Sequence, residues 1–157
     1  MEDIIIKDRK KYYELSRMVD VFNSFYSLSK IGETSIFDYD GKDLIAVTVS
    51  AVFSIEVCFK FLYYLFNDKK QKRIHEIKKL YSSIKDYGLE DFLLTGFTID
   101  EINMFLNQIN TAFEDFRYLY EYESKLSITP SLLRDFIFNI NNYCNLLYKD
   151  NVKKQFD

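Results

Sequence analysis

The chain has the length and composition of one globular domain. Its 157 residues are 48% hydrophobic, which excludes a disordered protein, and 4 Gly and 1 Pro are too few turn residues for a sheet of many strands. The net charge of −3 excludes a globally basic nucleic-acid-binding protein, so a site for a polyanion has to be a local patch. We expect residues 1–157 to form a single all-α domain.

Hydrophobic residues recur at helical spacing through the first half of the chain. This spacing predicts a first helix over residues 8–30 and a second over residues 43–67, separated by a segment rich in turn residues. The second helix is apolar on nearly every face, as is typical of a central helix. Its length would span a bilayer, but Glu56 and Lys60 near its centre favour a buried core helix, with no membrane span. No signal-peptide pattern opens the chain, so we expect a cytoplasmic protein.

The second half of the chain predicts two short helical pieces and then two long helices. The short pieces cover residues 75–84 and 89–94. Thr98 and Glu101 have the spacing of a capping box and predict a third long helix that ends near residue 123. Thr129 as cap and Pro130 as first helical residue open the last helix. The fold class predicted is an up-and-down bundle of about four long helices, with short helices between the second and third.

The cysteines and the histidine are too few for a zinc site. Cys58 and Cys144 lie in apolar helical segments and are expected to be buried, reduced thiols. Together with the sole histidine they make three potential ligands, whereas zinc needs about four. We expect no metal and no cofactor.

Two polar positions interrupt the apolar second helix. Glu56 and Lys60 stand at positions i and i+4, the spacing of a helical ion pair. A charge inside a bundle must be paired, because burying it without a partner costs several kcal/mol. The pair is therefore either an internal structural ion pair or part of a polar site.

Further candidate residues follow in the second half of the chain. His75 opens a predicted helix, either as an exposed residue or as an acid or base at a polar site. Arg117 and Glu121 share a helix face within a run of aromatic residues, where an arginine is expected to stack on a ring or to pair with an acid. The densest positive patch is a candidate phosphate or RNA contact, although such a run is more often a solvated loop; it comprises Lys69, Lys70, Lys72, Arg73, Lys78 and Lys79.

These motifs, taken in order, resemble domains of the HEPN superfamily (higher eukaryotes and prokaryotes nucleotide-binding). The run AVTVSAVFSIEVCFKFLYYL resembles the family's second helix, with its E-x-x-x-K matched by Glu56 and Lys60. A histidine–apolar–Lys–x–Leu segment follows at His75. The later run AFEDFRYLYE resembles the family's Phe…Arg-Tyr-x-Tyr-Glu segment, through Phe113, Arg117, Tyr118, Tyr120 and Glu121. Order and rough spacing agree over residues 44–147.

The resemblance implies a helical bundle, often a homodimer, that acts around RNA as a ribonuclease, toxin partner or phage-defence protein. Nucleolytic members usually carry R-x(4–6)-H, and this chain departs from that pattern because no arginine stands at that distance before His75. The leading hypothesis is therefore a domain that binds RNA, a nucleotide or a protein partner. In it, Lys60 and Arg117 hold phosphate, Tyr118 stacks on a base, and Glu56 and Glu121 orient the cations.

Two other hypotheses use the same residues. In an atypical metal-independent ribonuclease, His75 would move a proton and Arg117 would stabilise the charge that develops on phosphorus. In a purely structural dimer or adaptor, the residues would form a buried polar network and would contribute only stability.

Overall fold

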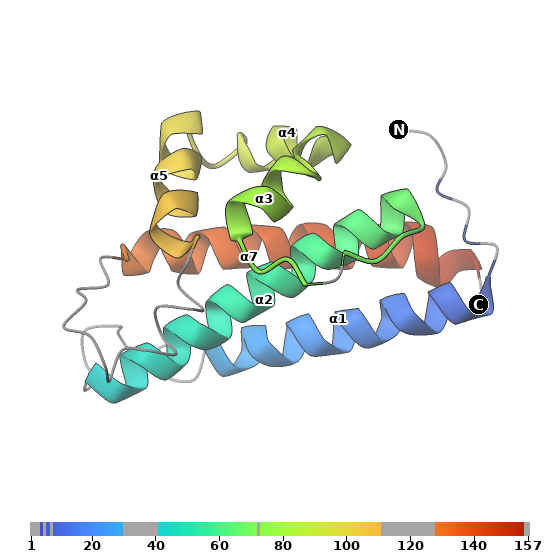
Figure 1. Ribbon diagram of the computed structural model, residues 1–157, viewed down its shortest axis with the longest axis horizontal. Coiled ribbons are helices and arrows are strands. Elements are labelled where there is room, and N and C mark those ends of the chain that lie inside the picture. The colour runs from blue at the N-terminus through green and yellow to red at the C-terminus, as the bar shows by residue number, and fades with distance from the viewer. Residues whose placement is uncertain are drawn as a thin grey trace.

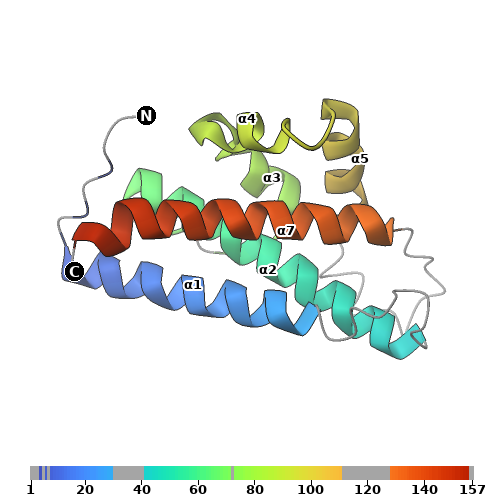
Figure 2. The same cartoon turned by 180° about the vertical axis from the view of Figure 1, so that it is seen from behind.

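The described part of the chain is built from helices joined by turns and loops and contains no strand, which confirms the predicted all-α class. The computed structural model describes residues 4, 6, 8–29, 41–71, 73–110 and 128–155, apart from the side chains of residues 41–44, and it contains no strand there. The long helices are α1 (Arg9–Ser29), α2 (Gly41–Asn67) and α7 (Pro130–Leu147). They run side by side along the molecule (Figures 1 and 2). The shorter α3 (Ile77–Ser82), α4 (Glu90–Leu93) and α5 (Ile99–Ile109) lie over α2 and α7, on the side opposite α1 (Figures 1 and 2).

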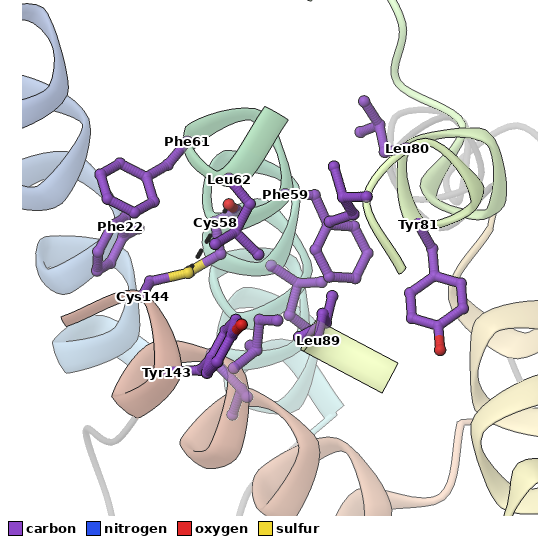
Figure 3. Close-up of a cluster of buried hydrophobic side chains, with 14 of the residues drawn as sticks. Phe22, Cys58, Phe59, Phe61, Leu62, Leu80, Tyr81, Leu89, Tyr143 and Cys144 are labelled. Atoms are coloured by element: carbon purple, nitrogen blue, oxygen red, sulfur yellow. Dashed lines mark hydrogen bonds between the residues drawn. The ribbon is translucent and has the colours of Figure 1, made fainter. Parts of the chain in front are cut away.

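Helix α2 is the centre of the bundle, as its apolar faces predict. Phe59 and Phe61 are both fully buried, although they point to different sides of the helix. Phe61 lies beside Phe22 of α1, whereas Phe59 faces the segment that carries Leu80 (Figure 3). Contacts of α2 with α1, α7 and α3 follow from this all-round apolar surface.

By length and composition, the segment Ile45–Asn67 of α2 could cross a membrane. Within the 18-residue window that meets this test, 56% is buried inside the bundle.

A polar network fixes how α1 and α7 lie against each other. Asn23 Oδ1 accepts hydrogen bonds from Asn141 Nδ2 at 3.2 Å and Asn145 Nδ2 at 3.0 Å. Asn23 Nδ2 returns a bond to Asn145 Oδ1 at 3.1 Å. Amide donors and acceptors therefore satisfy one another where the two helices meet, which favours this register over a slipped one.

The observed ends of the later helices agree in part with those predicted from the sequence. The capping box at Thr98 and Glu101 is present, with both reciprocal bonds, and Pro130 is the first residue of α7. Thr129 stands at the N-cap position, but its side chain caps no backbone N–H. Its hydroxyl instead accepts a bond from Gln108 Nε2 at 3.4 Å. The predicted third long helix is α5 as far as Ile109, and the remainder of that prediction lies outside the described residues.

The described residues of the connector between α2 and α3 are not helical, so α3 begins later than predicted. The sequence places a helix start at His75, whereas α3 begins at Ile77 after Glu76 in extended conformation. Arg73 has a φ of 65°, a left-handed conformation that turns the backbone just before His75. The hydrogen bond from His75 to α2 holds this segment against the helix surface and delays the first turn of α3.

Candidate functional site

Glu56 lies in the core of the bundle with a carboxylate that water barely reaches. The residue is 2% exposed and belongs to the same stretch of α2 as the fully buried Ile55, Cys58 and Phe59. A carboxylate in such surroundings needs cationic or hydrogen-bond partners, because desolvation otherwise costs several kcal/mol.

Two partners converge on one oxygen of this carboxylate. Lys60 Nζ, one turn further along α2, lies 2.6 Å from Glu56 Oε1. His75 Nδ1, from the connector, lies 3.0 Å from the same oxygen. The side chain of Lys60 is 18% exposed and that of His75 is 50% exposed, so the cluster runs from the core to the surface. The structure thus brings together three of the six polar-site candidates of the sequence: Glu56, Lys60 and His75.

The second oxygen of Glu56 is left without a donor. Glu56 Oε2 is buried and accepts no hydrogen bond from the described residues. A buried acceptor in this state costs roughly 1–3 kcal/mol, and more when it carries charge. An unsatisfied buried acceptor in a native structure calls for an explanation, such as a catalytic role or a bound water or ion that supplies the missing donor.

The contact with Glu56 orients the imidazole of His75. An ionised carboxylate only accepts hydrogen bonds, so the tautomer that fits such a partner carries its proton on Nδ1. In the neutral ring, Nε2 is then the basic nitrogen. A half-exposed imidazole held by a buried carboxylate has the arrangement of an oriented general base.

The described members of the basic run are exposed, but they differ in how they are paired. Lys70 bonds to Glu14 at 2.7 Å and Lys79 to Glu76 at 2.5 Å. Lys78 Nζ donates to Asn107 Oδ1 at 2.7 Å. Two further cations, Lys69 and Arg73, are exposed and have no partner among the described residues. Among the described cations of this run, Lys69 and Arg73 are therefore the best placed to meet a phosphate.

A pocket of about 310 Å³ adjoins the cluster on the side of α1. Lys60 forms part of both, and the remaining lining residues come from α1, α2 and the connector: Glu14, Arg17, Met18, Tyr64, Lys70 and Gln71. Sequence reasoning missed the contribution of α1, because Glu14 and Arg17 look like ordinary polar residues on the solvent face of an amphipathic helix. Their spacing carries no signal that α1 meets the connector here.

Both oxygens of the Glu14 carboxylate already have hydrogen-bond partners in this pocket. Its Oε2 accepts from Tyr64 Oη at 2.6 Å and its Oε1 from Lys70 Nζ at 2.7 Å. The bonds from Lys70 and then from Tyr64 hold the pKa of Glu14 below its usual range. Burial, and then the bond to Glu14, raises the pKa of the Tyr64 hydroxyl well above its ordinary value. Both groups keep their ordinary charge states at neutral pH.

Several predicted site residues lie outside the described part of the chain. These are Arg117, Tyr118 and Glu121 of the candidate polar site, and Lys72 of the basic run. The approach of Arg117 to Glu56 and His75 therefore stays a prediction.

Within the described residues, no group of three or more His, Cys, Asp or Glu side chains lies close enough together to hold a metal ion. The cysteines instead contact each other's helices in the core: Cys144 Sγ lies 3.8 Å from the Cys58 carbonyl oxygen (Figure 3). Burial, and then the neighbouring Cys58, raises the pKa of the Cys144 thiol. Both cysteines are buried and free of disulfides.

Compared with models of protein families, with curated proteins and with solved structures, the chain matches none.

Proposed function

We propose that this chain is a HEPN-like helical domain that binds single-stranded RNA at the surface around His75. The observation that carries the proposal is the Glu56–Lys60–His75 cluster, in which a buried carboxylate orients a half-exposed imidazole. The order of these residues along the chain is the order in which the HEPN-like motifs occur. The unmatched oxygen of Glu56 adds an acceptor that no described residue satisfies.

The connector supplies the electrostatic part of this proposal. His75 follows Lys69 and Arg73, two exposed cations without a described partner, in a chain whose overall charge is −3. A local cluster of this kind neutralises phosphates and releases counterions, so the affinity should fall as salt rises. Single-stranded RNA fits better than a duplex, because the cations stand on a short non-helical connector rather than on a helix or ribbon that would enter a groove.

Fluorescence anisotropy with a labelled single-stranded RNA tests the proposal across a series of salt concentrations. The double variant Lys69→Gln with Arg73→Gln removes two expected phosphate contacts. Each contact contributes about 0.7 to the slope of log affinity against log salt, so the slope should decrease in magnitude by about 1.4.

A matched control removes the same charge from the C-terminal turns, through Lys149→Gln with Lys153→Gln. Both of these lysines are exposed, and neither belongs to the connector. The control should retain the wild-type slope. Equal losses in both double variants would show a general charge effect and would contradict a binding surface at the connector.

A metal-independent ribonuclease is the second candidate, and the orientation of His75 favours it. The carboxylate–imidazole contact at 3.0 Å provides a possible general base, whereas the arginine expected to stabilise charge on phosphorus is Arg117. Because the chain lacks the R-x(4–6)-H spacing, we expect no robust cleavage of single-stranded RNA in the presence of EDTA. Cleavage that His75→Ala or Arg117→Ala abolishes, with the fold intact by circular dichroism, would establish the enzyme instead.

A further inference from the structure

The pocket on the α1 side of the cluster is lined by more positive charge than the neighbouring carboxylates balance. Arg17, Lys60 and Lys70 line it; Glu56, outside the lining, pairs with Lys60, and the carboxylate within the described lining is that of Glu14. That carboxylate already accepts from Tyr64 and Lys70, one bond on each oxygen. Arg17 is exposed and pairs with no acid among the described residues. The pocket therefore retains unused N–H donors on three positively charged side chains.

The donor chemistry of these side chains selects a particular class of anion. A guanidinium presents its N–H groups as a rigid fork that matches two oxygens of a phosphate or carboxylate. The ammonium groups of Lys60 and Lys70 each have three N–H donors, and one bond to a carboxylate is found for each. A doubly charged tetrahedral oxyanion has enough acceptor oxygens to meet all three side chains at once.

The rest of the lining fits a ligand larger than a bare ion. About 310 Å³ is at the lower end of the range for small-molecule pockets, and Met18 gives it an apolar wall. Gln71, also in the lining, has a buried Oε1 that no described residue satisfies. An organic phosphate that carries a hydroxyl could supply the missing donor.

We infer that this pocket binds a small phosphomonoester through Arg17, Lys60 and Lys70, and that its occupancy is coupled to the Glu56–His75 contact through Lys60. The inference does not rest on RNA binding, because it uses neither Lys69 nor Arg73.

Lys60 provides the coupling because it belongs to both sites. Its Nζ lies 2.6 Å from the oxygen of Glu56 that also contacts His75 Nδ1 at 3.0 Å. A phosphate that binds the Lys60 ammonium draws positive charge toward the pocket and weakens the hold of Lys60 on Glu56. The carboxylate then bonds more strongly to His75. By linkage, if phosphate changes the affinity of a second ligand that contacts Glu56 or His75, that ligand must change the affinity for phosphate by the same factor.

The single histidine makes this coupling measurable without ambiguity. Inorganic phosphate and ribose 5-phosphate are titrated into the purified chain at fixed pH and ionic strength, without RNA, and the ring-proton NMR signals of His75 are followed. We expect saturable shifts, with ribose 5-phosphate binding more tightly than inorganic phosphate. The same titrations by calorimetry give the affinity independently of the histidine signal.

The variant Arg17→Gln tests the pocket, and Arg9→Gln is its matched control. Both remove one exposed arginine from α1, but Arg9 lies about two turns away and outside the lining. Loss of a charged hydrogen-bond donor should weaken phosphate binding by about tenfold or more in Arg17→Gln, with Arg9→Gln unchanged. Circular dichroism checks that both variants are folded.

Three outcomes would overturn the inference. Shifts that rise without saturation would show non-specific ion effects. Shifts that persist unchanged in Arg17→Gln would place phosphate directly on His75 or the connector. Calorimetric binding that leaves the His75 signals unmoved would contradict the coupling through Lys60. Since no RNA is present, none of these results bears on RNA binding, and a failure to bind RNA would leave this test intact.

Discussion

Removing the carboxylate of Glu56 should destabilise the domain far more than removing a comparable surface carboxylate. The variant Glu56→Ala leaves the Lys60 ammonium, which is 18% exposed, without its 2.6 Å partner and opens a space in the core. Breaking a buried ion pair from one side costs about 3–5 kcal/mol. Because Lys60 and the half-exposed His75 can both turn partly toward water, we expect about 2–4 kcal/mol.

A second substitution at the same position separates the stability contributed by the charge of Glu56 from that contributed by its volume. Glu56→Gln keeps the volume and one acceptor oxygen, so it should lose mainly the charge assistance of two hydrogen bonds, about 1–2 kcal/mol. The surface control is Glu76→Ala, which breaks a 2.5 Å pair with Lys79 whose side chains are 64% and 49% exposed. That pair is screened by water and should contribute no more than about 0.5 kcal/mol.

Urea denaturation followed by far-ultraviolet circular dichroism measures these differences, with thermal melts as a second readout. For a domain of this size, the loss expected for Glu56→Ala corresponds to a fall in Tm of roughly 5–15 °C. If Glu56→Ala is as mild as Glu76→Ala, Glu56 is not a buried, paired charge, and no polar site is built on it.

Three further perturbations test other parts of the structure. The bonds from Lys70 and Tyr64 lower the pKa of Glu14, so they stabilise the fold at neutral pH, and this stabilisation is lost as the pH falls below the usual glutamate range. The free energies of unfolding of wild type and Lys70→Gln, measured against pH, should therefore differ at neutral pH and converge in acid. Asn141→Leu leaves its amide partners unsatisfied and should cost about 1–3 kcal/mol in urea denaturation, and a neutral result would show that the asparagine network is dispensable. Since burial raises the pKa of the Cys144 thiol, a thiol reagent should modify it only after unfolding, and rapid labelling of the native chain would contradict its burial.

The bundle itself could be predicted because its signals are local. The apolar faces of α2 indicate a central helix, and Pro130 and the Thr98 capping box mark helix starts through the backbone groups next to them. Lys11 shows where such reasoning fails. It is buried and donates to the Leu65 carbonyl oxygen at 3.0 Å and to Asp68, at the end of α2. Nothing in the sequence around Lys11 indicates that this lysine caps the end of a different helix.

In the candidate site, too, the contacts within one helix could be predicted from the sequence, whereas those between separate segments could not. The Glu56–Lys60 pair follows from helical spacing, since four residues place two side chains on one face. The contact of His75 joins residues 19 apart and depends on the path of the connector, which the left-handed conformation of Arg73 redirects. The α1 wall of the pocket depends on the docking of two helices, and no local pattern encodes the position of Arg17 beside Lys60.

The most direct test of the proposed function is an NMR titration of the chain with single-stranded RNA at low salt, following the ring signals of His75. The account predicts that these signals shift or broaden with the same dissociation constant that anisotropy gives, and that the effect weakens in the Lys69→Gln with Arg73→Gln variant. RNA that binds while His75 remains unperturbed, or no binding at all at low salt, would contradict an RNA site built around this histidine.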